Sequence, residues 1–137
     1  MTAIMGILLA AFLQSPVPAV DTVARDNSSG IEDAREAVAR SAAEWAKLWR
    51  EHAGSQPAPP VDFATRTVVA VFLGTRPSAG YAVEITGTRV DGADLVIQWS
   101  ERRPEKGMVA AQVLTSPSHI VTVPKVAGSI RFEKAGQ

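Results

Sequence analysis

Hydrophobic residues recur at helical spacing in the stretch that follows Gly30. One stripe consists of Ile31, Ala34, Val38, Ala42, Trp45, Leu48, Trp49 and His52. Steps of three and four residues place these side chains on one face of an α-helix. Polar residues just before Ile31 offer N-caps, and Gly54 lies where a glycine commonly ends a helix. The pattern therefore predicts an amphipathic helix over residues 31–53, whose two tryptophans pack on a sheet.

From residue 61 onward the pattern becomes that of β-strands. Residues 67–73, TVVAVFL, are apolar without alternation, which is typical of a strand covered on both faces, and the helix is the expected cover for one face. Alternating stretches and a hairpin turn at 90–94 follow. Strands are expected over 67–73, 81–86, 95–99, 108–114, 119–123 and 129–132. This order predicts an α+β fold that is mainly antiparallel β, with one N-terminal amphipathic helix packed on an antiparallel sheet or small β-sandwich of about six strands.

The N-terminus carries an unbroken apolar run from Ala3 to Leu13. This run is too short for a bilayer span, which needs about 20 residues. It suits the core of a signal peptide, and Val17-Pro18-Ala19 offers small residues for cleavage, although no Lys or Arg precedes Arg25. We expect a signal peptide over 1–19, a polar tether over 20–30, and a single domain over 31–133 with its β part at 61–133. The protein is then exported, to the periplasm or the extracellular space.

Composition narrows the function classes. The chain has 14 basic and 14 acidic residues and no cysteine. A net charge of zero provides no electrostatic footprint for nucleic acid or an acidic membrane. The lack of cysteine excludes disulfides, thiol catalysis, thiolate metal sites and lipidation of a cysteine. The two histidines, His52 and His119, stand alone, so neither a metal nor a cofactor is expected.

No catalytic constellation is visible in the sequence. Ser118 and His119 are adjacent, and adjacent strand residues point to opposite faces. A G-x-S-x-G elbow is lacking, and the carboxylates are scattered. The basic cluster Arg102-Arg103 with Lys106 is offset by Glu101 and Glu105. We therefore expect neither an enzyme nor a nucleic-acid-binding protein.

The stretch GTRPSAGY, residues 74–81, is longer than a strand connection requires. Gly74 and Gly80 can supply positive φ and Pro77 fixes its own φ, so a purely structural interpretation explains them. It leaves Arg76 unexplained. Arginine and tyrosine are enriched at protein interfaces. The predicted partner-binding residues are Thr75, Arg76, Pro77, Ser78, Tyr81 and His119. For His119, a structural hydrogen bond is the alternative.

An ordered series of motifs resembles a known family. The series is W-x-x-L-W-x-x-H at 45–52, P-x-V-D-F at 59–63, V-V-A-V-F-L-G at 68–74, T-R-P-S-A-G-Y at 75–81 and L-T-x-P-x-H-x-V-x-V-P-K at 114–125. From Ile31 to Phe132 the chain resembles the domain named for the C-terminal part of PrcB, a protease complex subunit. The resemblance implies a small exported bacterial protein, in some members accessory to a surface protease, and it implies no catalysis. The chain lacks a lipoprotein cysteine, so the resemblance does not extend to surface anchoring.

A second resemblance concerns residues 76–81 alone. R-P-S-A-G-Y is similar in outline to the N-P-T-T-G-Y loop that chagasin-like inhibitors of papain-type proteases carry on an immunoglobulin-like sandwich. It departs in having Arg for Asn, and that family's later glycine-rich loop is missing. Three hypotheses follow. The first is a non-enzymatic exported protein-binding module whose partner is another protein, with a protease as one candidate. The alternatives are a direct protease inhibitor that uses the Thr75–Tyr81 loop and a structural cell-envelope protein. The sequence leaves the oligomeric state open.

Overall fold

The computed structural model describes residues 20–136, so the predicted signal peptide over 1–19 lies outside the described residues. Within these described residues, seven strands and one helix follow one another. They are β1 (Asp21–Asp26), β2 (Arg35–Ala39), α1 (Ala42–Ala53), β3 (Arg66–Phe72), β4 (Ala82–Asp91), β5 (Asp94–Arg102), β6 (Ser118–Pro124) and β7 (Ile130–Lys134).

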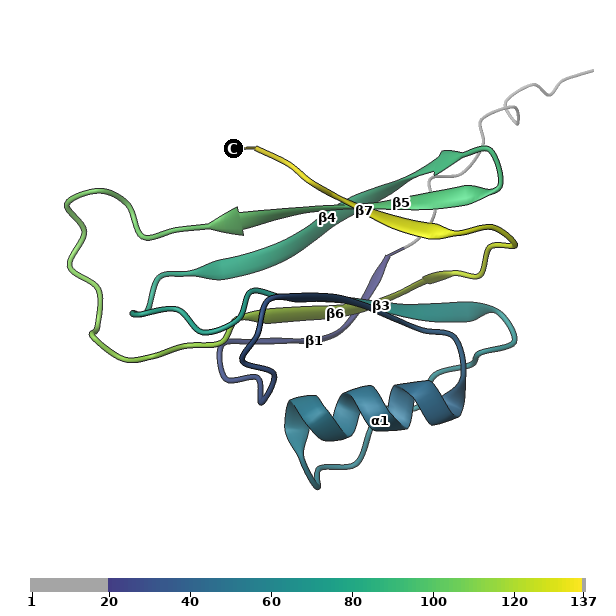
Figure 1. The fold of residues 1–137 in the computed structure, drawn as a ribbon, viewed down its shortest axis with the longest axis horizontal. Coiled ribbons are helices and arrows are strands. Elements are labelled where there is room, and N and C mark those ends of the chain that lie inside the picture. Colours follow the sequence, from purple (N-terminus) through teal and green to yellow (C-terminus); the bar gives the residue numbers. More distant parts are fainter. Residues whose placement is uncertain (1–19, 137) are drawn as a thin grey trace, which may run out of the picture.

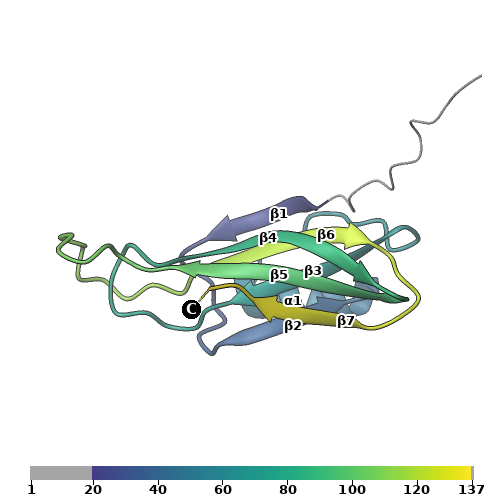
Figure 2. The same ribbon diagram turned by 90° about the horizontal axis from the view of Figure 1, so that it is seen from above.

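The strands form two open sheets that face each other. One sheet has the order β1-β6-β3-β2 and the other has the order β4-β5-β7. The helix lies beneath the four-stranded sheet, which gives three layers (Figure 1). Seen from above, β1 and β4 run along one long side of the molecule, and β2 and β7 run along the other (Figure 2). The predicted mainly antiparallel α+β fold with one helix is confirmed.

One strand pair is parallel. β7 pairs with β5 from Leu95↔Ile130 to Trp99↔Lys134, whereas the other strand pairs are antiparallel. The chain can return in the same direction without a second helix because β6, in the other sheet, carries it back between β5 and β7.

Strand β3 separates two hydrophobic cores. Its Val69 and Val71 face the space between the sheets, where they pack with β4, β5 and β6. Its Val68, Ala70 and Phe72 face the helix and pack with Trp45, Leu48 and Trp49. The expectation that this strand is covered on both faces, with the helix tryptophans covering one, is therefore confirmed.

The predicted helix over 31–53 begins eleven residues too early, because α1 spans Ala42–Ala53 and part of the preceding stretch is strand β2. The Ser41 hydroxyl accepts a hydrogen bond from the Glu44 backbone N–H at 3.2 Å, and the Glu44 carboxylate accepts one from the Arg40 N–H at 2.7 Å. These two bonds cap the N-terminal end of the helix at Ser41, much as in a capping box. Val38 and Ala39 belong to a strand that pairs with β3, so helical spacing alone was misleading there.

The predicted polar tether over 20–30 is also wrong, because Asp21–Asp26 form β1. This strand pairs antiparallel with β6, from Asp21↔Thr122 to Asp26↔Ser118. Its polar composition reflects its place at the edge of the sheet, where side chains face water and charged residues discourage further pairing.

The predicted strand over 108–114 is a loop. Pairing between β4 and β5 ends at Ala82↔Arg102, so no strand among the described residues lies beside residues 108–114 for them to pair with. Pairing resumes just after this stretch, in two isolated bridges that join Thr115 to Arg76 and Ser116 to Ser28. The hydrophobic side chains of this stretch therefore stay outside both cores.

Candidate functional site

Three loops meet at one end of the sandwich, and we call this region the loop end. They comprise residues 27–34, 73–81 and 103–117. β1 ends, β3 ends and β6 begins at this point, as the shared partner Ser118 of Asp26 and Phe72 indicates. Figure 1 shows these connections together at the end of the molecule away from the β4–β5 turn. Backbone hydrogen bonds join the loops, from Thr75 N–H to Glu32 O (3.1 Å) and from Ser116 N–H to Asn27 O (2.8 Å).

Arg76 contacts several different parts of the loop end. Its Nε lies 3.2 Å from Glu101 Oε2, and its Nη1 donates to the Leu73 carbonyl at 3.0 Å. Its guanidinium also lies 5.8 Å from the centre of the Tyr81 ring. The side chain is 27% exposed. Arg76 thus links its own loop to β5, a contact that the sequence did not indicate.

Glu101 is the acidic residue that forms an ion pair with Arg76. Its carboxylate is only 4% exposed and also lies 3.1 Å from the Lys134 ammonium. Burial by itself would raise the pKa of Glu101, but the hydrogen bonds from Arg76 and Lys134 outweigh that effect and lower it. Glu101 is therefore ionised at neutral pH, and the cations around it are structurally required.

Beside this ion cluster lies an open cleft of about 300 Å³ between the sheets, on the side formed by β2 and β7. Its lining includes Arg35, Glu36, Arg76, Trp99, Glu101 and Lys134. The Trp99 indole N–H donates to the Glu36 carboxylate across the sheets at 3.0 Å. The Lys134 ammonium lies 5.2 Å from the Trp99 ring centre. The cleft therefore combines an aromatic wall with charges of both signs.

The other predicted residues of the 75–81 loop lie around Arg76. Thr75 and Pro77 are exposed, and Ser78 and Tyr81 are half-buried. The Ser78 carbonyl accepts a hydrogen bond from the Thr115 hydroxyl at 3.1 Å. The structure thus brings these five residues together, and their use in binding stays a prediction.

His119, the sixth predicted residue, lies apart from them on β6 and is buried. Its Nδ1 accepts from the Ile85 backbone N–H at 2.9 Å, so the proton is on Nε2, which donates to the Thr22 hydroxyl at 2.9 Å. Burial, together with the nearby Arg25, lowers the pKa of His119 to about 4. The ring is neutral and joins the two sheets. This geometry favours the structural alternative for His119.

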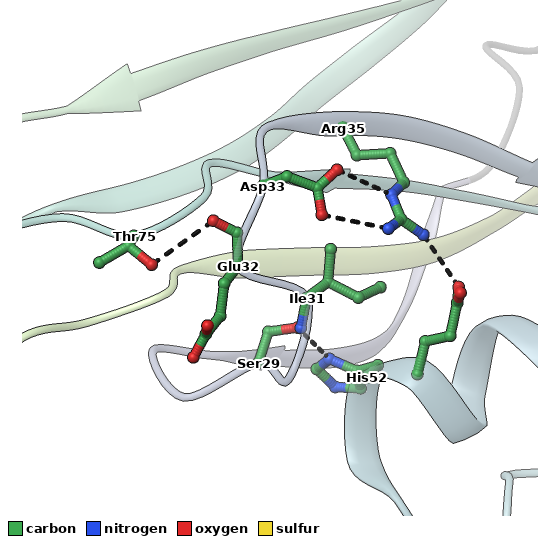
Figure 3. A network of polar contacts seen from close by, with 8 residues as sticks. Ser29, Ile31, Glu32, Asp33, Arg35, His52 and Thr75 are labelled. Carbon is green, nitrogen blue, oxygen red and sulfur yellow. Dashed lines mark hydrogen bonds and ion pairs between the residues drawn. The ribbon is translucent and has the colours of Figure 1, made fainter.

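A second polar network fastens the 27–34 loop to the helix (Figure 3). The Ser29 hydroxyl lies 2.8 Å from His52 Nδ1 and accepts from the Ile31 N–H at 3.0 Å. His52 Nε2 lies 3.4 Å from the Asp26 carboxylate, and burial lowers the pKa of His52.

The Arg35 guanidinium bridges Asp33 and Glu51 in the same view (Figure 3). Its hydrogen bond lowers the pKa of Asp33. This network positions the loop that carries Glu32, the acceptor for Thr75.

Sequence reasoning missed Trp99, Glu101 and Lys134 as parts of the site. A signal existed in the period-two pattern of β5, where Leu95, Ile97, Trp99 and Glu101 share one face. The first three of these pack in the inter-sheet core. A carboxylate that continues a buried face needs a cation. Arg76, which the structural interpretation of residues 74–81 left unexplained, is one such cation.

Residues 67–124, from β3 through β6, match the family model described as PrcB C-terminal. The resemblance inferred from the motifs is confirmed over this range, which is less than half of the 137 residues. The comparisons with curated proteins and with solved structures found no match. Within residues 20–136, no helix is long and apolar enough to cross a membrane, and no group of three or more His, Asp or Glu could hold a metal ion.

Proposed function

We propose that this chain is a non-enzymatic, exported protein-binding module that engages another protein at its loop end. The family resemblance makes a protease complex the first setting in which to look for that partner. The contact surface we propose consists of the 75–81 loop and the adjoining cleft.

The observation that carries this proposal is the composition of the cleft. Arg76, Trp99 and Lys134 lie around one opening of about 300 Å³, and Tyr81 lies next to Arg76. Arginine and aromatic residues dominate the energetics of protein interfaces when they are held rigidly. Here the ion cluster around Glu101 holds Arg76 and Lys134 in place, and a hydrogen bond to Glu36 holds Trp99, so little conformational entropy is lost on binding.

The same end of the molecule offers little support for catalysis. Ser29, His52 and Asp26 have the residue types of a hydrolytic triad. However, the Ser29 hydroxyl is buried and accepts the Ile31 N–H, and its own backbone N–H donates to the Ser116 carbonyl. A substrate carbonyl has no access to this hydroxyl, so we assign the trio a structural role.

We give the inhibitor alternative less weight, because the 75–81 loop is braced rather than projecting. Arg76 pairs with Thr115 through two backbone hydrogen bonds of 2.7 and 2.9 Å, and Ala79 N–H donates to Ala111 O at 3.0 Å. A loop that inhibits a protease by entering its cleft must leave its backbone groups free for the protease. Here backbone groups of Arg76 and Ala79 are already bonded to the 103–117 loop. Export rests on the apolar run and cleavage-like residues near the N-terminus.

Site-specific photo-crosslinking in extracts of the native source tests the proposal. One variant carries the photoreactive residue at position 78, within the proposed surface, and a control carries it at position 90. Val90 is 61% exposed and lies in the β4–β5 hairpin at the opposite end. We expect a discrete crosslinked partner from position 78 alone. The same products from both positions, or none from either, would contradict the proposal.

A paired variant separates binding from folding. Arg76→Gln together with Glu101→Gln removes both charges, so no unpaired carboxylate is left buried. We expect this double variant to unfold at a temperature close to that of the wild type and to lose most of the crosslinking at position 78. Full crosslinking in a folded double variant would exclude the ion cluster from the interface.

A further inference from the structure

The 103–114 loop is the most exposed apolar segment among the described residues. Five large hydrophobic side chains are exposed in this part of the chain, and four lie on this loop: Met108, Val109, Val113 and Leu114. Val109 is 97% exposed and Leu114 is 76% exposed. Figures 1 and 2 show the loop extending beyond both sheets. Such a concentration on one projecting loop indicates a surface that something apolar covers.

The base of this loop is positively charged once internal ion pairs are considered. In the sequence, Glu101 and Glu105 offset the basic cluster. In the structure, Glu101 is buried and already matched by Arg76 and Lys134. Arg102, Arg103 and Lys106 are exposed around the base of the loop, with Glu105 as the one exposed acid among residues 102–114. Residues 102–114 therefore carry a local charge of about +2, although the net charge of the whole chain is zero.

We propose that the 103–114 loop inserts its aliphatic tip into the interfacial region of an anionic lipid bilayer. Met108 and Val109, at the tip of the loop, enter the boundary between headgroups and acyl chains, and Arg102, Arg103 and Lys106 contact lipid phosphates. Apolar insertion combined with basic flanks is the combination that holds peripheral proteins on anionic membranes.

The chemistry of the tip favours lipid over a second protein. Its exposed large apolar side chains, Met108 and Val109, are not aromatic and lie next to the exposed cations Arg103 and Lys106, and an anionic lipid surface satisfies both features at once. The aromatic residues near this end, Trp99 and Tyr81, lie under Lys134 and Arg76 instead. A convex aliphatic tip also fits a deformable lipid surface without a preformed pocket.

The orientation of the strands allows insertion without obstruction. β1 runs antiparallel to β6, so its first residue, Asp21, pairs with Thr122 away from the loop end. Within the described residues, the loop thus projects from the end opposite the start of β1. The 103–114 tip can therefore meet a membrane while the sheets remain in water.

Fluorescence of a single labelled cysteine tests this insertion directly, because the chain has no cysteine of its own. Full-length Val109→Cys carries an environment-sensitive NBD label, and Val90→Cys carries the same label as the control. Vesicles consist of phosphatidylcholine alone or of phosphatidylcholine and phosphatidylglycerol in equal parts. We expect a blue shift and an intensity rise only for the label at position 109 with phosphatidylglycerol. An unchanged spectrum at position 109 in that mixture at low salt would overturn the proposal.

Vesicle sedimentation of unlabelled variants separates the two contributions. Val109→Asp should lower the partition coefficient about tenfold because it removes an inserted side chain. Arg103→Ser with Lys106→Ser should lower it about 25-fold, since each basic residue near an anionic surface contributes about fivefold. Val90→Asp should leave it unchanged. Equal binding by Val109→Asp and wild type would show that the tip does not insert.

Other occupants of the tip give different results. If wild type self-associates in sedimentation velocity and Val109→Asp is monomeric, the tip is an interface between copies and the lipid proposal fails. If Val109→Asp abolishes the crosslink from position 78 while wild type ignores vesicles, the tip binds protein and the lipid proposal fails. Vesicle binding involves no protein partner, so its outcome is independent of the crosslinking result at position 78.

Discussion

Two neighbouring loops at the loop end are held in opposite ways. In the 73–81 loop, Arg76 bonds to Glu101 and Leu73, and Thr75 and Ala79 donate to the adjoining loops. The 103–114 loop has few bonds of its own beyond Met108 N–H to Glu105 O and Val113 N–H to Ala111 O, and it exposes four large apolar side chains. The contrast shows that glycine, proline and arginine can make a loop stand out in the sequence because these residues hold the loop in place.

The largest expected difference between these loops comes from two glycines with similar backbone angles. Gly74 has φ 81° and Gly107 has φ 85°. A Cβ at 74 would lie 2.8 Å from the Ala34 backbone nitrogen, whereas one at 107 meets nothing within 4 Å. Gly74→Ala should cost about 3 kcal/mol, from backbone strain and overlap, and Gly107→Ala about 1 kcal/mol, from strain alone. Urea unfolding measures both, and equal losses would contradict the distinction.

Acid should destabilise the contact between the two sheets that His119 makes from β6 to the backbone of Ile85. The pKa of His119 falls from the usual 6.5 to about 4 on folding. Between these values the unfolded state binds a proton that the folded state does not. The free energy of unfolding should therefore fall by about 3 kcal/mol as the pH drops from about 6.5 to about 4.

His119→Asn offers the Ile85 N–H an acceptor that does not titrate. It should flatten the pH dependence in this window, as measured by urea unfolding at a series of pH values. The neighbouring charges Arg25 and Glu84 remain in both proteins, so they cancel in the comparison. An unchanged slope in the variant would assign the pH dependence to another group.

A smaller difference should separate two arginines near Glu101. Arg76 lies 3.2 Å from the Glu101 carboxylate, whereas Arg103 lies 3.8 Å away and is 70% exposed. Arg76→Ala should cost about 2 kcal/mol, because the buried carboxylate keeps only Lys134 as a close partner. Arg103→Ala should cost less than about 0.5 kcal/mol. Thermal unfolding measures both.

The Arg76→Ala loss should shrink when Glu101→Gln is already present. A full-sized loss in that background would mean that Arg76 acts through its bond to Leu73 instead.

The central elements could be predicted from the sequence because their patterns have one interpretation. Residues 67–73 are rich in β-branched residues and largely apolar on both faces, which is typical of a strand buried between two layers. The hairpin at 90–94 and the turns of helix around Trp45 and Trp49 were equally clear. The edges were not. β1 looks like a tether because an edge strand is polar, and β2 looks helical because alanine and glutamate favour helices.

The candidate site shows the same division. The sequence placed Thr75, Arg76, Pro77, Ser78 and Tyr81 together because they are contiguous. It could not join Arg76 to Glu101, which are far apart along the chain and meet only because the loop after β3 packs on the end of β5. It also counted Glu101 as a surface charge that offset Arg102 and Arg103.

The sequence by itself determined a mainly antiparallel domain with one helix, a doubly buried central strand and a glycine- and proline-shaped loop, because periodicity and backbone conformation are local properties. Only the tertiary structure decided which charges are neutralised internally and which hydrophobic side chains stay in water. Charge pairing and burial depend on which strands become neighbours. For this reason only the structure shows that Arg76 pairs with the buried carboxylate of Glu101, and that Val109 and Leu114, expected in a strand, lie exposed on a loop.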